Sequence, residues 1–179
     1  MIRSTKQGVL FSDEKMTLIH GGESRAGKRK VRRPIALKRP MHFVFKSSQL
    51  ASSSSFLLKR NREFISNLLK KEARLSGIRI YHQSINSNHI HLATYGKSRF
   101  GYQRFLRVVS SKIAQFITRA QKTKPLSEKF WDNVPFSRIV EWGLSFKTLT
   151  NYIQQNILES QGMIRYTPRN NKPTKASTE

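Results

Sequence analysis

The chain has 179 residues, enough for one domain with a single hydrophobic core, and 37% of them are hydrophobic, so it is not a wholly disordered basic protein. Its 34 Lys and Arg residues against 10 Asp and Glu residues give a formal net charge of +24, which is typical of a protein that binds a polyanion. Cysteine is absent, which excludes disulfides, thiolate zinc sites and cysteine nucleophiles.

Residues 1–39 form a strongly basic segment, whose densest cationic cluster is Lys28, Arg29, Lys30, Arg32 and Arg33. This composition predicts a disordered arm that contacts DNA phosphates, and the alternative is a solvated tail that only aids solubility. Residues 165–179 also lack an apolar period, so we expect a flexible tail there. Residues 40–164 are then left as the folded domain.

The folded domain is predicted to begin with a strand and a helix. Residues 41–45 are apolar and aromatic, which predicts a strand, and the polar stretch 46–55 predicts a loop. Apolar residues recur at helical spacing over 56–75. A serine run offers N-caps for this helix, and Gly77 offers a stop.

A hairpin and a second helix are predicted next. Residues 78–85 and 89–94 are strand-like, and the turn-forming side chains of Asn86, Ser87 and Asn88 lie between them. The apolar residues of 102–117 keep a spacing of three to four, which predicts an amphipathic helix that ends before Pro125.

The last two segments complete the predicted fold. Residues 136–143 alternate and predict a fourth strand ending at Gly143, and 146–158 predict a last helix. The order of strands and helices is that of a split βαβ pair, so we predict an α+β, ferredoxin-like fold with a four-stranded antiparallel sheet and two helices on one face. The last helix is additional to this pattern and can cross the free face of the sheet.

Two histidines flank one isoleucine in the second strand of the predicted hairpin. Alternate residues of a strand share a face, so His89 and His91 point one way while Ile90 points toward the helical layer. Two imidazoles side by side are a ready pair of metal ligands. This spacing also arises by chance in a chain with five histidines, so the motif alone does not establish a metal site.

The predicted last helix carries a tyrosine and an asparagine four residues apart. Helical spacing puts Tyr152 and Asn156 on one face, beside an apolar stripe of Leu149, Ile153 and Ile157. A tyrosine half-buried at a core edge, with an asparagine near the helix end, gives the same pattern, so packing alone also explains it.

The histidine pair and the helix are more informative together. A helix crossing the free sheet face would bring Tyr152 and Asn156 next to His89 and His91. Two imidazoles and an amide oxygen can hold a divalent cation that polarises a DNA phosphate beside a tyrosine nucleophile. Tyrosine has a pKa near 10 in general, so its attack needs such electrostatic help. The few central carboxylates argue against a two-metal nuclease, and no glycine-rich phosphate loop or nucleophile elbow is present.

Five short motifs extend this observation over residues 39–158. In chain order they are Arg39 to Val44, Asn88 to Leu92, Gly101 to Gln103, Phe136 to Gly143 and Asn151 to Asn156. This ordered series resembles the HUH-type single-tyrosine transposases, in particular the REP-associated tyrosine transposase branch. It is far more specific than the two histidines alone.

The resemblance implies a ferredoxin-like fold, single-stranded DNA as substrate, and Mg²⁺ or Mn²⁺ as cofactor. It also implies a covalent 5′-phosphotyrosine intermediate that frees a 3′-hydroxyl. By position, His89 and His91 match the family's metal-binding histidines, Tyr152 its nucleophile, and Asn156 its polar third ligand. Ile157 departs from the branch, in which many members have proline at this position, and this leaves the exact end of the helix open.

Four other side chains on the predicted strands are secondary candidates. We interpret His42 and His82 as structural or DNA-contacting residues. Arg138 and Trp142 share a strand face, where they either pack at the rim of the sheet or contact a phosphate and stack with a base. Both interpretations stay open, and Arg138 is included among the DNA-binding candidates.

We therefore predict a metal-dependent transposase or nickase that cleaves and rejoins single-stranded DNA, at hairpin-forming repeats. The alternative is a non-catalytic basic ferredoxin-like module, but such modules usually expose aromatic side chains for stacking bases, where this chain has two histidines. A third possibility is a degenerate member of the transposase family that the host retains for its own benefit. No apolar run is long enough for a membrane span and no secretory signal is visible, so we expect a cytoplasmic, DNA-associated protein without a membrane partner.

Overall fold

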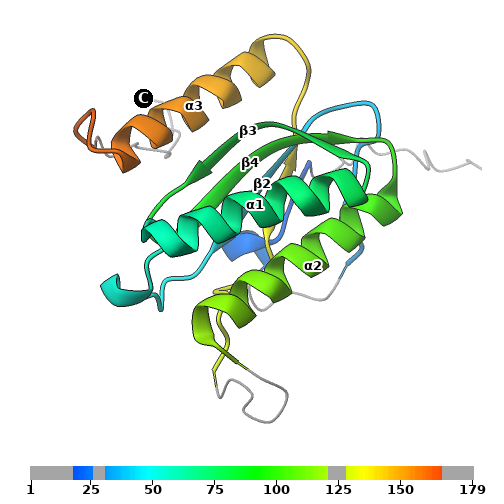
Figure 1. Ribbon diagram of the computed structural model, residues 1–179. Coiled ribbons are helices and arrows are strands. Elements are labelled where there is room, and N and C mark those ends of the chain that lie inside the picture. Colours follow the sequence, from blue (N-terminus) through cyan, green and yellow to red (C-terminus); the bar gives the residue numbers. More distant parts are fainter. Residues whose placement is uncertain (1–17, 26–30, 121–127, 167–179) are drawn as a thin grey trace, which may run out of the picture.

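The computed structural model describes residues 18–25, 31–120 and 128–166. Its strands are β1 (Ile19–His20), β2 (Met41–Lys46), β3 (Ile78–Ile85), β4 (His89–Gly96) and β5 (Phe136–Ile139). Its helices are α1 (Lys59–Leu75), α2 (Arg99–Thr118) and α3 (Leu144–Ser160), with two short 3₁₀ turns, η1 (Gly22–Arg25) and η2 (Ser52–Ser54). Helices α1 and α2 lie on one face of the sheet and α3 lies on the other (Figure 1).

All neighbouring strands of the sheet are antiparallel, in the order β1-β5-β2-β4-β3. The last four strands of this order, together with α1 and α2, form the predicted α+β, ferredoxin-like arrangement. Strands β3 and β4 form the predicted hairpin, in which the backbone N–H of Asn86 donates to the carbonyl of His89 at 2.9 Å. A register shift between Ile80 and His82 sets Tyr81 apart from the regular alternation.

The main core lies between the sheet and the pair α1 and α2. Phe43 of β2 and Ile90 and Leu92 of β4 point into it and are fully buried. They meet the apolar stripes of the two helices, which comprise Ile65, Leu68, Leu69, Ala73, Tyr102, Phe105, Leu106, Val109 and Ile113. Because strand residues alternate, this burial forces the histidines of β4 onto the opposite face.

A glycine allows α2 to approach the end of α1 closely. A Cβ atom at Gly101 would lie 2.3 Å from the carbonyl oxygen of Ser76, the residue that caps α1. Ser98 caps the start of α2, and its Oγ accepts from the N–H of Gly101 at 3.2 Å. Any larger residue at position 101 would collide with the end of α1, so close packing of the two helices requires glycine there.

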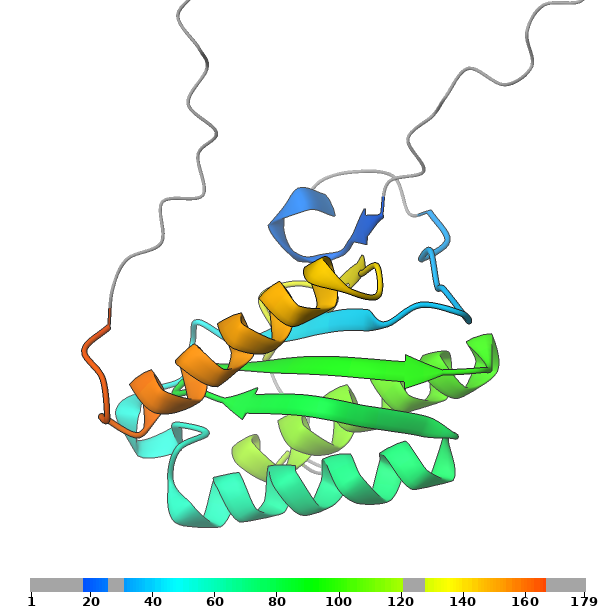
Figure 2. The same ribbon diagram turned by 90° about the horizontal axis from the view of Figure 1, so that it is seen from above.

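Helix α3 is held on the other face by a second, smaller cluster. Ala93 of β4 and Val140, after β5, contact Leu149 and Ile153 of α3. Seen from above, α3 runs diagonally over the strands (Figure 2). Gly143 precedes the helix with a φ of +85°, a conformation that glycine adopts readily, and so turns the chain from β5 onto this face.

Several element ends differ from the sequence-based predictions by a few residues, and those of α1 and β5 have a local cause. Helix α1 begins at Lys59 after Leu58, whose side chain makes no capping bond, and part of the serine run forms η2 in place of an N-cap. Strand β5 ends at Ile139 and not at Gly143. The N–H of Val140 donates to the carbonyl of Pro40 at 2.9 Å, but Pro40 has no N–H to donate in return, so the pairing with β2 stops there.

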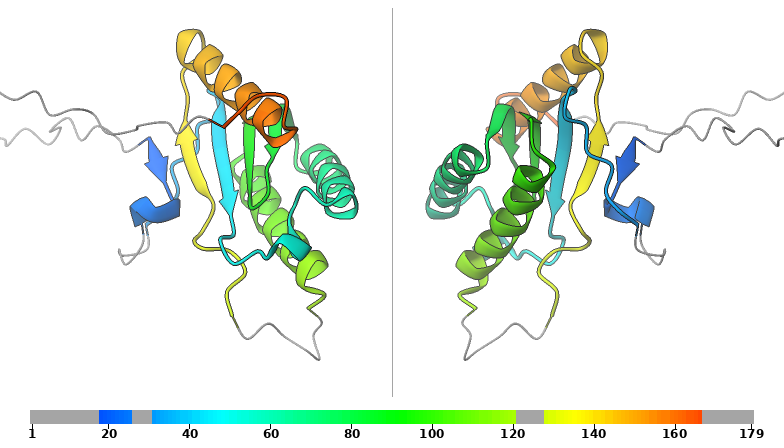
Figure 3. Two further views of the ribbon diagram at one scale, coloured as in Figure 1. Left: turned by 90° about the vertical axis from the view of Figure 1, so that its left-hand side faces the viewer. Right: turned by 90° about the vertical axis from the view of Figure 1, so that its right-hand side faces the viewer.

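The sheet has a fifth strand, which lies in the segment expected to be a disordered arm. Strand β1 pairs with β5 through Ile19↔Arg138 and His20↔Ser137, at the edge of the sheet (Figure 3). Polar contacts hold the neighbouring residues 31–39, since Arg33 Nη1 donates to Ser137 Oγ at 2.6 Å. The structure thus differs from the prediction for residues 18–25 and 31–39. Backbone pairing holds β1, and Ile35 and Ala36 pack against the main core, but so few residues give no hydrophobic period that a sequence pattern could detect.

Other parts of the predicted arm and tail lie outside the described residues. These are residues 1–17 and 26–30, which include Lys28, Arg29 and Lys30, and residues 167–179. In the parts of the chain that are described, no helix is long and apolar enough to cross a membrane.

Candidate active site

The sheet face beneath α3 gathers three histidines. In the pairing of β2 with β4, His91 lies opposite Val44, His89 opposite Lys46, and His42 opposite Ala93. Paired residues of an antiparallel sheet share a face, so all three imidazoles lie on the α3 side. The ring centroids of His89 and His91 are 4.9 Å apart, and the two rings are nearly perpendicular.

Tyr152 reaches this face from α3. Its ring centroid lies 5.2 Å from that of His91, with the rings at 88°, and 6.4 Å from that of His42. The tyrosine is half-buried, while Leu149 and Ile153 on either side of it anchor the helix. The predicted juxtaposition of the tyrosine helix with the histidine strand is therefore present in the structure.

Asn156 lies one helical turn after Tyr152 and is buried, with 5% exposure. Its Nδ2 donates to the backbone carbonyl of Tyr152 at 2.7 Å. This bond orients the amide group, so that Oδ1, its acceptor atom, is directed away from the Tyr152 carbonyl. Tyr152 and Asn156 thus share the helix face that packs on the sheet.

His42 is a member of the site that sequence analysis treated only as a secondary candidate. Its Nε2 is hydrogen-bonded to Nδ1 of His91 at 3.2 Å, and the two rings are stacked at an interplanar angle of 15°. Burial, reinforced by the charge of Arg138, lowers the pKa of His42 to about 3, so its ring is neutral. Strand alternation puts His42 on the same face as Val44, but only the register of β2 on β4 places it beside His91.

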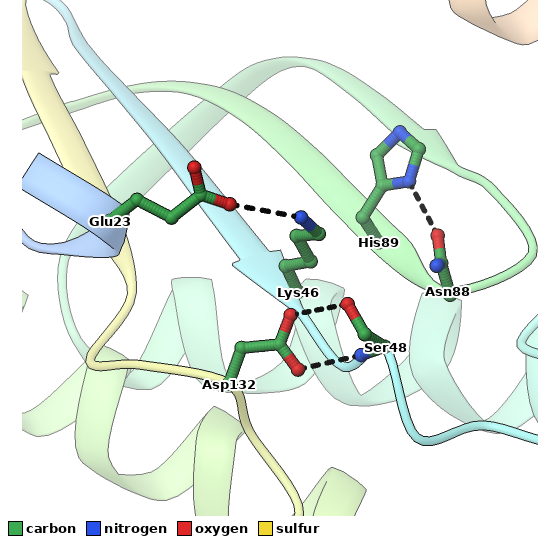
Figure 4. Close-up of polar contacts among 6 residues, drawn as sticks. All are labelled: Glu23, Lys46, Ser48, Asn88, His89 and Asp132. Atoms are coloured by element: carbon green, nitrogen blue, oxygen red, sulfur yellow. Dashed lines mark hydrogen bonds and ion pairs between the residues drawn. The ribbon is translucent and has the colours of Figure 1, made fainter. Parts of the chain in front are cut away.

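His89 lies at the edge of the site, where the polar surroundings are visible in Figure 4. Its Nδ1 is 2.9 Å from Oδ1 of Asn88, its neighbour in the chain. Lys46, which pairs with His89 across the strands, forms an ion pair with Glu23 at 3.2 Å. The ammonium group nearest to His89 in the strand register is therefore in contact with a carboxylate at the protein surface.

A shallow hollow of about 320 Å³ adjoins this edge. It is lined by Gly22, Glu23, Val44, Lys46, Asp132, Asn133, Val134 and Phe136. The carboxylate of Asp132 accepts from the N–H and Oγ of Ser48 at 2.7 and 2.6 Å, so it is engaged in holding the loop after β2. These hydrogen bonds contribute to the lowered pKa of Asp132, against the opposing effect of burial.

The side chains at this site include donor types that suit a divalent cation. His89 and His91 carry imidazole nitrogens on one sheet face, and Asn156, buried on the helix over that face, carries an amide oxygen. The described residues contain no group of three or more His, Cys, Asp or Glu side chains suited to a metal. Two imidazoles with one oxygen ligand suit Mn²⁺ better than Mg²⁺, which prefers an all-oxygen shell.

The other tyrosines are placed less favourably for chemistry at the histidines. Tyr102 is fully buried in the main core, and this burial raises its pKa. Tyr81 and Tyr95 contact the ring of Trp142, at 5.8 and 6.0 Å between centroids. Tyr166 is exposed at the end of the last described segment.

Of the predicted DNA-binding residues that the structure describes, Arg32 and Arg138 are exposed and Arg33 is partly buried. Arg138 is exposed on the α3 side of the sheet, opposite His42 in the pairing of β2 with β5. Arg32 is also exposed, whereas Arg33 is partly buried against Ser137, and this burial lowers its pKa to about 10. His82 lies on β3 near Phe146, with ring centroids 6.5 Å apart.

Comparison with known proteins adds information at the level of the fold. No family model and no curated protein matches the chain. Among solved structures, the chain is similar to a REP-associated tyrosine transposase bound to a REP hairpin, with a TM-score of 0.54 and 14% identity over 76% of each chain. A Deinococcus radiodurans R1 protein described as a candidate transposase has a TM-score of 0.42 and 12% identity, over 72% of this chain and 98% of that one. The chain thus shares the α+β fold of the hairpin-bound transposase.

Proposed function

We propose that this chain is a metal-dependent DNA strand transferase that cleaves and rejoins single-stranded DNA through a covalent bond to Tyr152. The observation that carries the proposal is the position of the Tyr152 ring, 5.2 Å from His91, on the face that also holds His89. The fold shared with a hairpin-bound tyrosine transposase supports hairpin-forming repeats as the target.

In the proposed cleavage step, the phenol oxygen of Tyr152 attacks the phosphorus of the scissile phosphate. A P–O bond to tyrosine forms, the P–O bond to the 3′ oxygen breaks, and the proton lost by the phenol is balanced by the one taken up at the 3′-hydroxyl. Rejoining reverses these changes when a 3′-hydroxyl attacks the phosphotyrosine. One phosphoester bond is exchanged for another in each step, so no external energy source is required.

His89, His91 and Asn156 are the residues that would hold the cation. When bound, the cation supplies charge that stabilises the phosphate as negative charge builds up in the transition state. Tyr152 is held by a helix docked on a rigid sheet, which lowers the entropic cost of bringing the phenol to the phosphate. Arg138 adds a cationic side chain on the same face, where it can contact a DNA phosphate.

The covering of the sheet by α3 favours this proposal over a non-catalytic nucleic-acid-binding module. Modules that bind RNA on a sheet need an open face with aromatic side chains for stacking bases. Here α3 crosses the corresponding face and packs on Ala93 and Val140 (Figure 2). The same face also holds the imidazoles of His42, His89 and His91, which suit metal binding better than base stacking.

The direct test is the detection of a covalent DNA adduct. Single-stranded oligonucleotides with a hairpin, labelled at the 3′ end, are incubated with the full chain and Mn²⁺ and separated under denaturing conditions. We expect a labelled protein band that peptide mapping assigns to Tyr152 and that EDTA abolishes. Tight DNA binding without any adduct, over a panel of hairpin sequences, would favour the non-catalytic module instead.

A further inference from the structure

We propose that His42 and Asn88 are positioning residues that set the tautomers of His91 and His89, so that both histidines carry their lone pair on Nε2. The inference deepens the proposed function, because it takes the two histidines as the candidate metal ligands. It concerns the hydrogen bonds made by Nδ1 of each of these two rings. Neither the sequence motif nor the fold comparison assigns a role to these bonds.

The tautomer of His89 follows from its bond to Asn88. Nδ1 of His89 lies 2.9 Å from Oδ1 of Asn88 (Figure 4). An amide oxygen only accepts hydrogen bonds, so Nδ1 of His89 carries the proton. In a neutral imidazole the lone pair then belongs to Nε2, which is the atom that has to ligate a cation.

The tautomer of His91 depends on His42 in the same way. Nδ1 of His91 lies 3.2 Å from Nε2 of His42, and each of these nitrogens can donate or accept. If His42 donates, neutral His91 keeps its proton on Nε2 and has no lone pair for a metal. If His91 donates from Nδ1, its lone pair is on Nε2. Only the second arrangement lets His91 be a ligand, so His42 is the acceptor.

The surroundings of His42 suit this role. The ring is 7% exposed, stacked on His91, and in edge contact with Phe136 at 6.0 Å and Tyr152 at 6.4 Å. These contacts oppose rotation of the ring away from His91. Histidines that bind metals usually donate their second N–H to a fixed acceptor, which orients the ring and makes it a better ligand. A cation on Nε2 in turn makes the Nδ1 proton a stronger donor.

The test begins with the metal-free protein. Nitrogen-15 NMR of labelled histidines reports which ring nitrogen carries the proton, and we expect Nδ1–H in both His89 and His91. In His42→Phe, which keeps a ring but loses the acceptor, we expect His91 to shift toward the Nε2–H tautomer while His89 is unchanged. In Asn88→Ala we expect His89 to shift toward the Nε2–H tautomer while His91 is unchanged. Because this measurement needs neither metal nor DNA, its outcome is independent of strand-transfer activity.

Metal affinity gives the second measurement, by titration of Mn²⁺ into the full chain. Loss of such an acceptor typically weakens metal binding by about 10- to 100-fold, and we expect this for His42→Phe and for Asn88→Ala. His42→Gln keeps an acceptor near the position of Nε2 and should recover most of the affinity. The matched control is His82→Phe, which makes the same change at a histidine on β3 that lies beside Phe146, and it should bind Mn²⁺ as the wild type does.

Two results would overturn the inference. One is an Nε2–H tautomer of His89 or His91 in the metal-free wild-type chain. The other is a His42→Phe variant that binds Mn²⁺ as tightly as the His82→Phe control. If His42→Phe does not fold, the tautomers of the wild-type chain alone decide the matter.

Discussion

The ring of Tyr152 stands perpendicular to that of His91, at 5.2 Å between centroids, although the two residues come from different elements and lie far apart in the sequence. Helix α3 provides the first and strand β4 the second, and the small cluster around Leu149 and Ile153 joins the two elements. The chemistry proposed for this chain depends on that contact.

Replacement of Tyr152 by phenylalanine should abolish the covalent adduct. The change removes one oxygen and keeps the ring contacts with His91 and His42, so we expect the free energy of unfolding to change by less than about 1 kcal/mol. Adduct yield on a 3′-labelled hairpin and thermal unfolding measure the two effects. Tyr95→Phe is the matched control and should retain the adduct. An adduct in Tyr152→Phe, or one mapped to Tyr95, would refute the assignment.

Replacement of His89 by alanine should separate catalysis from DNA binding. Loss of one cation ligand removes about 3 kcal/mol of transition-state stabilisation, which is roughly a hundredfold in rate. DNA affinity should change little, because it depends on Lys and Arg side chains. Single-turnover cleavage and fluorescence anisotropy measure the two quantities. Full cleavage by the wild type in EDTA would show that no cation is needed.

Three residues of the basic cluster, Lys28, Arg29 and Lys30, should strengthen DNA binding without selecting a sequence. Contacts to phosphates position a protein and do not read bases. Replacement of all three by alanine should reduce the slope of log affinity against log salt by about 2 for single strands, if each contacts one phosphate. An unchanged slope would mean that these side chains do not contact DNA. Affinity ratios between different hairpins should stay the same.

Glu72 should stabilise the domain in a pH-dependent way. Its buried carboxylate joins Arg104 and Lys112 of α2 to α1, at 3.0 and 3.1 Å. Burial alone would raise the pKa of Glu72, but the bonds to Lys112 and Arg104 outweigh it and the net effect is a lowered pKa. A carboxyl with a lowered pKa in the folded state stabilises the fold above its unfolded pKa, and this contribution is lost as the pH falls through the folded value.

The Glu72→Gln variant tests this ion-pair network. We expect it to lose about 2 kcal/mol of unfolding free energy at neutral pH, since the two cations would keep only a neutral partner. The difference from the wild type should shrink as the pH falls below the pKa of an unfolded glutamate, about 4.3, and through the lowered pKa that Glu72 has in the folded protein. Urea unfolding at several pH values measures this. A difference that does not depend on pH would show that packing, and not charge, explains the loss.

Gly101→Ala should destabilise the fold. The added Cβ would lie 2.3 Å from the carbonyl oxygen of Ser76, and this atom belongs to backbone that cannot rotate away. Forced shifts of this kind cost about 1–3 kcal/mol. Thermal unfolding measures the effect, with Gln103→Ala, on the exposed side of α2, as a control that should be close to neutral.

Much of the fold and part of the site could be predicted from local patterns. The 3.6-residue period of 102–117 and the alternation of 78–85 and 89–94 are properties of short segments, and they define α2, β3 and β4 to within a few residues. The same alternation places His89 and His91 on one face. Helical spacing likewise puts Tyr152 and Asn156 on one side of α3.

Only the tertiary structure decided which of these segments meet, and in which register. The bond between His42 and His91 depends on the pairing of β2 with β4, which one residue of slip would abolish by turning His42 to the other face. Strand β1 was missed because its two residues join β5 through backbone bonds, which have no hydrophobic period. The hydrophobic period of a segment shows which of its side chains are buried. The pairing of distant segments determines which residues those side chains contact.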